Sequence, residues 1–290
     1  MNEGIAKSGT FRIGGTIDVH RLGYGAMQLT GKGVFGPPAD RENAKRVLRR
    51  AMELGVDLID TADSYGPDVN EELIAEALHP YPANLTIATK AGLVRPGPGQ
   101  WVPNGRPDHL RERCEGSLRR LKLDRIPLFQ LHRIDPNVPA EAQFETLAAL
   151  RSEGKIEHIG LSEASVGDIE RAKRFFPVAT VQNRYNVKER KQWEDVVAYC
   201  EREGIAFLPW FPLGSGKLDR VAALGEVARK HRATPSQVAL AWLLARSKVM
   251  IPIPGTASVA HLEENVGAGA IQLDAADMAA LDLVADLSRV

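Results

Sequence analysis

The sequence holds 290 residues, 44% of them hydrophobic, and its 37 Lys and Arg residues balance 37 Asp and Glu residues. That apolar content supports a large core and excludes intrinsic disorder, and the zero net charge gives no basic surface for nucleic acid or anionic lipid. The first fifteen residues lack the apolar centre of a signal peptide, and the longest apolar run, 238–245, is too short to cross a bilayer. We therefore expect a cytoplasmic protein that binds neither nucleic acid nor membrane.

The two cysteines, Cys114 and Cys200, are widely separated and match no metal-binding pattern. Each falls at helical spacing among apolar residues, which is typical of a thiol that faces the core. We expect both to be inert core residues in a reducing compartment, and we expect no metal site.

The chain begins with two short alternating runs around Gly14 and Gly15, within residues 9–20, which predict a β-hairpin. After it, short β-type runs alternate with segments of helical periodicity along the chain. Because the hairpin precedes this repeating part, we expect it to plug one end of the resulting fold. Eight β-type runs follow, at residues 21–24, 56–60, 85–90, 126–132, 156–161, 178–182, 205–211 and 249–253.

Three helical segments carry clear boundary signals, an N-cap residue before the apolar pattern or a glycine after it. One of them also has Pro235 at its first helical position and a capping box between Thr234 and Gln237. The predicted helices and their signals are 41–54 with Asp40 and Gly55, 141–153 with Gly154, and 234–245 with Thr234.

Regular alternation of strands and helices predicts a parallel sheet with helices on its outside. Eight such units in about 250 residues favour a closed (β/α)8 barrel, and an open doubly wound sheet is the alternative. No linker, composition shift or low-complexity tract divides the chain. We therefore expect residues 1–290 to form a single barrel domain.

Two connections are long, 25–40 and 91–107, and both are rich in glycine and proline. Both follow strands, so in a barrel they lie on the face where active sites form. They are either flexible surface or loops that contact the substrate. We favour the second interpretation, with Trp101 as an apolar wall.

The stretch GSGK at 214–217 resembles the end of a phosphate-binding P-loop but fails the pattern twice. The first glycine of that motif is replaced by Phe211, and Lys217 is followed by Leu218 instead of Ser or Thr. No predicted strand is followed by GxGxxG either, so a bound nucleotide would not use the open-sheet dinucleotide fingerprint.

Four ionisable residues fall at or just beyond the ends of consecutive strands: Asp60, Tyr65, Lys90 and His132. Each has an ordinary structural explanation by itself, such as capping a loop or packing in the core. Barrel closure, however, would bring all four to the same catalytic face. We therefore treat them as one candidate active site.

The chemistry of these four groups is complementary. A phenol with a pKa of ~10 is a weak acid at neutral pH, and a neighbouring ammonium is expected to lower that pKa. In this scheme Asp60 keeps Lys90 charged, Lys90 activates Tyr65, and His132 donates a hydrogen bond or assists proton transfer. Such a site suits carbonyl reduction, in which a proton reaches oxygen and a cofactor supplies hydride to carbon.

The motifs around these residues are similar to those of the aldo-keto reductase family. They occur in the family's order from about residue 20 to 270 and comprise IDTADSYG, the lysine that ends LTIATK, the histidine of QLHRIDP, IGLSEAS, VQNRYN, PWFPLGSG and IPIPGT. The forms GLSEAS and IPGT most resemble bacterial members of the pyridoxal reductase or pyridoxine 4-dehydrogenase type. The resemblance implies a (β/α)8 barrel that uses NADP(H), with NAD(H) not excluded, and a catalytic tetrad of Asp60, Tyr65, Lys90 and His132.

The resemblance also implies a set of cofactor contacts. Ser162 and Gln182 match ligands of the nicotinamide carboxamide, Glu163 stands where the family has Asn, and Trp210 matches the stacking aromatic. A carboxylate cannot donate to the carboxamide oxygen, so Glu163 departs from the pattern. Ser215 and Lys217 match a loop that crosses the pyrophosphate. The remaining expected contacts are Gly25, Ala26, Met27, Phe211, Pro212, Leu213, Gly214, Ile253, Pro254, Gly255, Thr256, Ser258, His261, Glu264 and Asn265.

A second departure concerns the adenosine 2′-phosphate, which many family members clamp with Lys and Arg. Residues 251–270 contain neither, because the matching positions are Gly255 and His261. Thr256, Ser258 and a helix N-terminus remain as an uncharged anion site. The resemblance thus predicts an NADPH preference that is weaker than usual.

Phe35 and Trp101 are the expected substrate contacts, and pyridoxal, other small aromatic aldehydes or quinones would fit an aromatic pocket. The segment after residue 272 is short, so we expect an open pocket and broad specificity. Two other functions stay open: a non-catalytic, nucleotide-sensing regulatory subunit, and isomerase or hydrolase chemistry on the same barrel. The sequence gives no indication of the oligomeric state.

Overall fold

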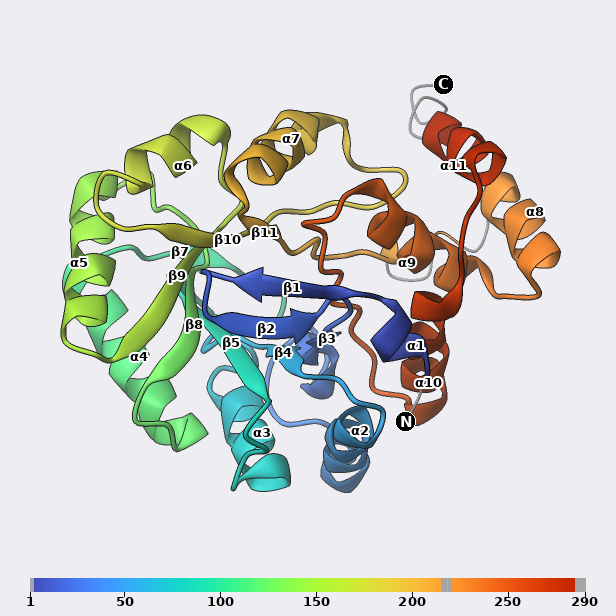
Figure 1. Cartoon of the computed structure of the whole chain (residues 1–290). Helices are drawn as coiled ribbons and strands as arrows, with labels where there is room; N and C mark the ends of the chain where they lie inside the picture. The colour runs from blue at the N-terminus through green and yellow to red at the C-terminus, as the bar shows by residue number, and fades with distance from the viewer. Residues whose placement is uncertain (1–2, 215–217, 219–220, 285–290) are drawn as a thin grey trace.

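The computed structural model describes residues 3–214, 218 and 221–284 and contains a seven-stranded parallel sheet curled into a barrel wall (Figure 1). Neighbouring strands pair in the order β11-β10-β9-β8-β5-β4-β3. The predicted (β/α)8 architecture is therefore confirmed for these strands. Their bounds are β3 (Tyr24–Gly25), β4 (Leu58–Asp60), β5 (Thr86–Ala91), β8 (Ile126–Leu131), β9 (Ile156–Ser162), β10 (Val178–Gln182) and β11 (Ala206–Phe207).

An extended segment, 249–254, occupies the eighth position in the barrel wall, where the sequence predicts a regular strand at 249–253. It joins the two edge strands through backbone hydrogen bonds on both sides and so closes the barrel. Because Pro252 and Pro254 have no N–H to donate, the segment only accepts on the β3 side. The four bonds are Phe207 N to Val249 O (2.8 Å), Ile251 N to Phe207 O (2.8 Å), Gly23 N to Pro252 O (3.0 Å) and Gly25 N to Pro254 O (3.2 Å).

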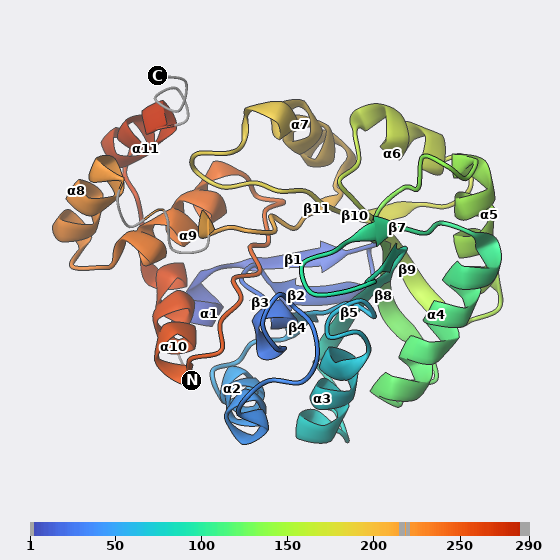
Figure 2. The same cartoon turned by 180° about the vertical axis from the view of Figure 1, so that it is seen from behind.

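Helices surround the strands, as Figures 1 and 2 show. The predicted end signals are confirmed, since Asp40 accepts from Asn43 N and Thr234 forms a capping box with Gln237. None of the helices among the described residues is long and apolar enough to cross a membrane. Their bounds are α1 (Glu3–Lys7), α2 (Arg41–Glu53), α3 (Val69–Leu78), α4 (Pro107–Leu121), α5 (Ala140–Ser152), α6 (Val166–Ala172), α7 (Glu194–Glu203), α8 (Ala222–His231), α9 (Pro235–Arg246), α10 (Val259–Gly267) and α11 (Ala275–Asp282), with 3-10 turns η1 (Ala26–Leu29), η2 (Lys191–Trp193) and η4 (Ala268–Ala270).

The predicted N-terminal hairpin is present as the antiparallel pair β1 (Thr10–Ile13) and β2 (Ile17–His20), which crosses one end of the barrel in Figure 1. Ile13 and Val19 are fully buried among the side chains that fill the barrel interior. Asp57 fixes the hairpin, because its carboxylate accepts from the backbone N–H of His20 at 3.0 Å. The hairpin therefore plugs the end opposite to the strand carboxyl ends.

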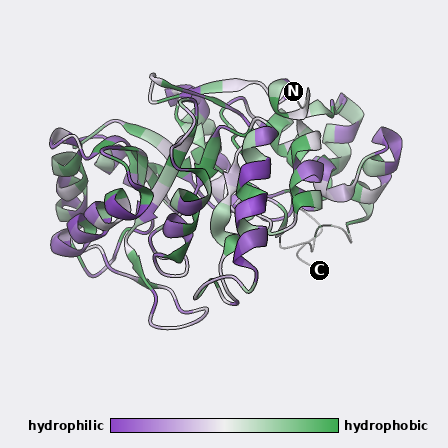
Figure 3. Ribbon diagram, turned by 90° about the horizontal axis from the view of Figure 1, so that it is seen from below, coloured by the Kyte–Doolittle hydropathy of each residue, from purple (hydrophilic) through white to green (hydrophobic). Residues whose placement is uncertain are grey.

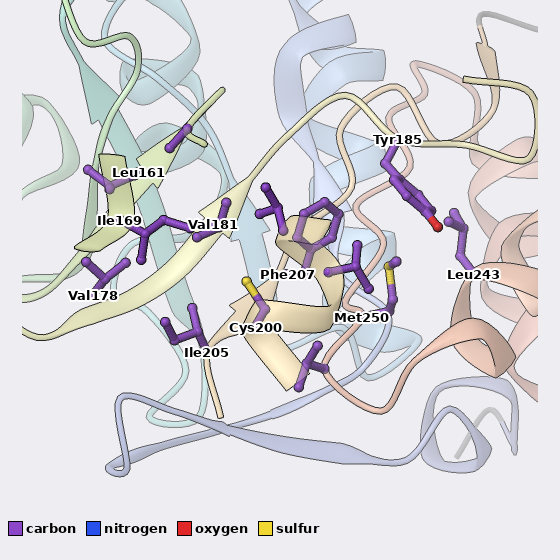
Figure 4. Close-up of a cluster of buried hydrophobic side chains, with 14 of the residues drawn as sticks. Leu161, Ile169, Val178, Val181, Tyr185, Cys200, Ile205, Phe207, Leu243 and Met250 are labelled. Carbon is purple, nitrogen blue, oxygen red and sulfur yellow. The ribbon is translucent and has the colours of Figure 1, made fainter. Parts of the chain in front are cut away.

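Apolar side chains fill the space between the strands and the helices. Figure 3 shows hydrophilic and hydrophobic stretches alternating along the helices, as expected for elements with one buried face. In the cluster of Figure 4, Cys200 packs near Val181, Ile205 and Phe207. Cys114 is buried as well, and burial raises the pKa of each thiol to about 12. Both cysteines are thus core thiols, as predicted.

The two long connections contain more order than the sequence indicates. Residues 91–107 include a two-stranded antiparallel ribbon, β6 (Leu93–Val94) with β7 (Val102–Pro103), at the end of the barrel opposite to the hairpin (Figure 2). Arg95 in this ribbon donates to the carbonyl oxygens of Gly33 (2.6 Å) and Val34 (2.8 Å), which belong to the other long connection. The two connections are therefore bonded to each other.

Barrel closure predicts an intolerance to side-chain volume at Gly25. A Cβ there would lie 2.6 Å from the carbonyl oxygen of Ile253, a backbone atom of the closing segment. We expect Gly25→Ala to lower the free energy of unfolding by about 1–3 kcal/mol, as overpacking does. Urea denaturation measures the change.

Gly225→Ala is the matched control, because it lies inside α8 with open space around its Cβ position. In that helix alanine should stabilise by up to about 1 kcal/mol. Equal effects of the two substitutions would contradict the role of the close contact at Gly25.

Candidate active site

A cavity of about 1150 Å³ opens at the carboxyl ends of the barrel strands. Side chains from successive strand ends line it: Asp60 from β4, His132 beyond β8, Ser162 from β9 and Gln182 from β10. Tyr65 joins them from the loop after β4. The parallel arrangement alone brings these residues together, because every strand ends on the same face.

Lys90 and Asp60 form an ion pair at the base of this cavity. Lys90 is fully buried, and its Nζ donates to Asp60 Oδ2 at 2.6 Å and to the carbonyl oxygen of Thr61 at 2.8 Å. The third neighbour of Nζ is the phenolic oxygen of Tyr65, at 3.4 Å. The ammonium is thus within hydrogen-bond distance of all three groups.

The other oxygen of Asp60 is also bonded. Asp60 Oδ1 accepts from the side-chain amides of Gln182 (2.9 Å) and Gln130 (3.1 Å). Two amide donors and one ammonium therefore satisfy this buried carboxylate. The pairing of Gln182 with Asp60 was not predicted from the sequence.

The pKa values of Lys90 and Tyr65 both lie above their ordinary values. Burial pulls the pKa of Lys90 down, but the nearby Asp60 carboxylate outweighs it, so the pKa lies above the usual range. Burial raises the pKa of Tyr65, and the Lys90 ammonium offsets only part of that rise. The expectation that Lys90 lowers the pKa of Tyr65 below ~10 was therefore wrong in its net direction. The phenol keeps its proton at neutral pH.

His132 is a neutral imidazole in this surrounding. Burial lowers its pKa well below the ordinary value, and the positive charges of Lys90, Arg133 and Arg95 add to the effect. Its ring meets the Tyr65 ring edge to face, with centroids 5.9 Å apart. Ser64 Oγ lies 3.3 Å from Nδ1, and a hydroxyl donating there leaves the proton on Nε2. Phenol and imidazole N–H then offer two donors to an oxygen atom in the cavity.

Aromatic side chains form the walls beside these donors. Trp101 lies 6.2 Å from Tyr65 between ring centroids, and the guanidinium of Arg95 lies 3.5 Å above the Trp101 ring. Trp210 forms another part of the lining and donates from Nε1 to Glu163 Oε1 at 2.6 Å. The site therefore pairs polar donors at its base with apolar walls, as small-molecule sites commonly do.

The family model described as Aldo/keto reductase family matches residues 21–286. The chain belongs to the aldo/keto reductase family. It is 50% identical to an uncharacterized oxidoreductase of Schizosaccharomyces pombe, over 96% of this chain and 90% of the relative. It is 43% identical to pyridoxine 4-dehydrogenase of Escherichia coli strain K12, over 95% and 98% of the two chains. An aldo-keto reductase of Klebsiella pneumoniae crystallised with NADPH superposes with a TM-score of 0.82, at 26% identity over 94% and 93% of the chains.

The structure places most of the residues that the aldo/keto reductase resemblance assigns to the cofactor on this cavity. Lys90 lies just beneath it, in contact with Tyr65. Ala26, Gly214 and Ser258 are outside the lining, and Ser215 and Lys217 lie outside the described residues. The residues that do line it are Gly25, Met27, Ser162, Gln182, Trp210, Phe211, Pro212, Leu213, Ile253, Pro254, Gly255, Thr256, His261, Glu264 and Asn265.

Glu163, also a predicted cofactor contact, is outside the lining of this cavity as well. Its backbone is left-handed, with φ of 54°, and its carboxylate accepts from Trp210 Nε1 and from the backbone N–H of Arg184 at 2.7 Å. These bonds connect the Glu163 carboxylate to the indole of Trp210 and to the backbone that follows β10. Phe35, a predicted substrate contact, is also outside the lining, which includes its neighbour Val34.

Several lining residues were missed by sequence reasoning. Arg133 was not predicted because His132, directly before it, was taken as the site residue at the end of that strand. Thr234 was recognised only as a helix cap, yet its hydroxyl also donates to Glu264 at 2.5 Å on the cavity wall. The others are Gln28, Val34, Leu93, Pro103, Pro235, Ser236 and Ala257.

The lowered pKa of His132 predicts a pH dependence of stability. Below pH ~6.5, the ordinary histidine pKa, His132 becomes protonated in the unfolded chain but stays neutral in the folded protein. The free energy of unfolding therefore falls as the pH falls. We expect His132→Gln to flatten this slope. Urea unfolding of both proteins between about pH 8 and pH 5.5 gives the comparison.

Only the difference between the two proteins is diagnostic. Burial raises the pKa of Asp63 to about 7, which makes stability fall as pH rises toward that value and so opposes the His132 effect. Asp63 is present in both proteins and cancels. Identical slopes for the wild type and His132→Gln would show that His132 does not titrate abnormally.

Proposed function

We propose that this protein is an NADP(H)-dependent oxidoreductase that reversibly reduces aldehydes and ketones to alcohols, with Tyr65 as the proton donor. The observation that carries the proposal is the contact between Tyr65 and Lys90 at 3.4 Å, beside neutral His132 and over the buried Asp60 ion pair. Family membership and the NADPH named for the Klebsiella pneumoniae neighbour support the same assignment.

The cavity fits a dinucleotide together with a small carbonyl compound. Its volume of about 1150 Å³ exceeds the range of roughly 300–1,000 Å³ that single small ligands occupy. Ser162, Gln182 and Trp210 would hold the nicotinamide end, and Thr256, His261 and Asn265 the adenosine end. When bound, the nicotinamide supplies the hydride that no side chain can provide.

The side chains of this chain would then handle the proton. Tyr65 gives its phenolic proton to the carbonyl oxygen as negative charge develops there. The Lys90 ammonium stabilises the phenolate that results, and Asp60 keeps that ammonium charged and in place. His132 donates a second hydrogen bond to the same oxygen, as donors placed for a developing oxyanion do. In the reverse direction the phenolate takes the proton back.

For the substrate, we propose pyridoxal or another small aromatic aldehyde. Trp101, Tyr65 and Trp210 give the cavity aromatic surface on which a planar ring can pack. The relative from Escherichia coli named pyridoxine 4-dehydrogenase supports this choice.

Tyr65→Phe removes the proposed proton donor and little else. We expect kcat for a reactive aromatic aldehyde to fall by about 10²–10⁴-fold, the usual contribution of a general acid. Steady-state oxidation of NADPH measures it. Tyr199→Phe is the matched control, since it deletes a phenol that hydrogen-bonds Lys173 and Glu170 away from the cavity.

Unchanged turnover in Tyr65→Phe would remove Tyr65 from the mechanism. A wild-type protein that binds NADPH but reduces no member of a broad carbonyl panel would overturn the enzyme proposal. That second outcome would favour the regulatory alternative.

The missing basic clamp predicts a modest coenzyme preference. Residues 251–270 contain no Lys or Arg, so NADPH should exceed NADH in kcat/KM by less than about 100-fold, roughly one charge-assisted contact. His261 lines the adenosine end, and His261→Arg should raise the ratio by adding a permanent cation. Parallel kinetics with both coenzymes give the ratios. A ten-fold advantage for NADH in the wild type would refute the NADP assignment.

A further inference from the structure

Arg133 is a cavity-lining residue that the proposed mechanism does not use. It follows His132 directly, and its Nη1 donates to the carbonyl oxygen of His132 at 2.5 Å and to Ser162 Oγ at 3.0 Å. Its Nε and Nη2 have no hydrogen-bond partner among the described residues. Neither atom is among the fully buried polar atoms without a partner, so each keeps some exposed surface, and Arg133 as a residue lines the cavity.

Three other partly buried arginines already have partners within the protein. Arg113 pairs with Asp63 and Asp68, and Arg120 pairs with Glu71. Arg95 uses all three of its nitrogens on backbone carbonyls. Arg133, in contrast, has no carboxylate within 4.0 Å in the part of the chain that the structure describes.

The Glu163 carboxylate acts on Arg133 electrostatically but forms no ion pair with it among the described residues. Glu163 follows Ser162, but its Oε1 accepts from Trp210 Nε1 and the backbone of Arg184. Burial lowers the pKa of Arg133, which shows that its charge is partly desolvated. A desolvated guanidinium with two unbonded nitrogens attracts an anion more strongly than one in water.

The free edge of Arg133 has the shape of a carboxylate receptor. Nε–H and one Nη2–H of a guanidinium are parallel and match the two oxygens of a carboxylate. Arg12 uses this same edge for Asp18 on the surface, with Nε and Nη2 at 2.7 and 2.8 Å from the two oxygens. In Arg133 the same edge meets no protein carboxylate among the described residues, and the residue lines the cavity.

We infer that Arg133 forms an anion subsite next to the reacting carbonyl, and that preferred substrates carry an acidic group, a carboxylate or a phosphate, close to their aldehyde or ketone. The inference rests on the proposed function, because it names the substrate class of the same site. The short distance along the chain from His132 to Arg133 limits the spacing between the acidic group and the carbonyl. Trp101 and Leu93 would pack on the uncharged part of the molecule.

The catalytic test uses matched charged and neutral aldehydes with NADPH. One pair is 4-carboxybenzaldehyde and 4-formylbenzamide, its meta isomers form a second, and pyridoxal 5′-phosphate with pyridoxal forms the phosphate arm. We expect the wild type to favour the charged member of at least one pair by about ten-fold or more in kcat/KM, as a charge-assisted bidentate contact provides. A preference seen only with the benzaldehyde pairs identifies the acidic group as a carboxylate, and one seen only with the pyridoxal pair identifies it as a phosphate.

Arg133→Met should reduce this charged-to-neutral ratio to about one, as loss of the bidentate contact requires. Arg133→Lys keeps the charge and should recover part of the ratio. Arg133→Gln is the second uncharged variant in case Met prevents folding. Arg111→Met, which breaks an exposed pair with Glu153, should keep the wild-type ratio.

Three results would overturn the subsite. One is a ratio near one in the wild type for every pair. Another is a ratio that survives in Arg133→Met. The third is an increase in the KM of NADPH in Arg133→Met with the charged-to-neutral ratio unchanged, which would assign the guanidinium to the coenzyme.

A binding measurement separates failure of this inference from failure of the proposed function. Trp101 and Trp210 line the cavity, so bound ligands should change their fluorescence. If no carbonyl compound is reduced at all, the reductase proposal falls, yet the subsite still predicts tighter binding of benzoate than of benzamide. Equal binding of the two, or a difference that persists in Arg133→Met, would remove the subsite as well.

Discussion

The ion pair between Lys90 and Asp60 is the interaction on which the rest of the site depends. Both side chains are buried, and a buried charge is tolerated only where it is paired and its hydrogen-bonding capacity is used. The bonds from Gln130 and Gln182 complete the Asp60 carboxylate, and they come from β8 and β10. One polar network thus joins β4, β5, β8 and β10 across the inside of the barrel. A shift in the register of β4 or β5 would separate the two charges, and a shift of β8 or β10 would remove an amide donor from Asp60.

The loop that carries Tyr65 is fixed around this network from several sides. Arg95 donates to the carbonyl oxygen of Ser64 at 3.1 Å, and Arg113 pairs with Asp63 at 2.7 Å. The backbone N–H of Asn70 donates to the carbonyl oxygen of Tyr65 at 3.1 Å. Because these bonds hold the residues on both sides of Tyr65 as well as its own backbone, contacts within the protein are enough to place the phenol over Lys90. Preorganisation of this kind is what stabilisation of a developing charge requires.

The sequence was sufficient for those features that follow from periodicity and chain direction. Alternating elements predicted the barrel, and the rule that parallel strands end on one face brought Asp60, Tyr65, Lys90 and His132 together. Residues 249–253 were predicted as a strand from their apolar pattern. Pro252 and Pro254, which cannot donate backbone hydrogen bonds, prevent a regular strand there. The β6–β7 ribbon was not predicted because its two short strands flank a tract rich in proline and glycine. Within that tract Arg95 donates to the carbonyl oxygen of Gln100, a contact that the sequence does not reveal.

Other errors came from properties that a sequence does not contain. The direction of the Tyr65 pKa depends on how deeply the phenol is buried, and that depth is set by the tertiary fold. Glu163 was expected to face the cofactor because its position matched a family ligand. Its left-handed backbone and its bond to Trp210 follow from the tertiary fold, and neither can be read from residue type. Arg133 was missed for the opposite reason, because nothing in its local pattern distinguishes a free guanidinium from a paired one.

These two departures have a common electrostatic consequence. Asp60 is paired with Lys90 and His132 is uncharged, so Arg133 keeps its positive charge on the cavity lining, beside the partly compensating charge of Glu163. The charge of Arg133 also contributes to lowering the pKa of Tyr65, against the larger effect of burial. In the proposed subsite, an acidic group bound at Arg133 would partly screen this contribution and leave Tyr65 more dependent on Lys90. Anion binding and activation of the phenol would then be coupled, and the gain in substrate affinity would oppose part of the electrostatic help given to proton transfer.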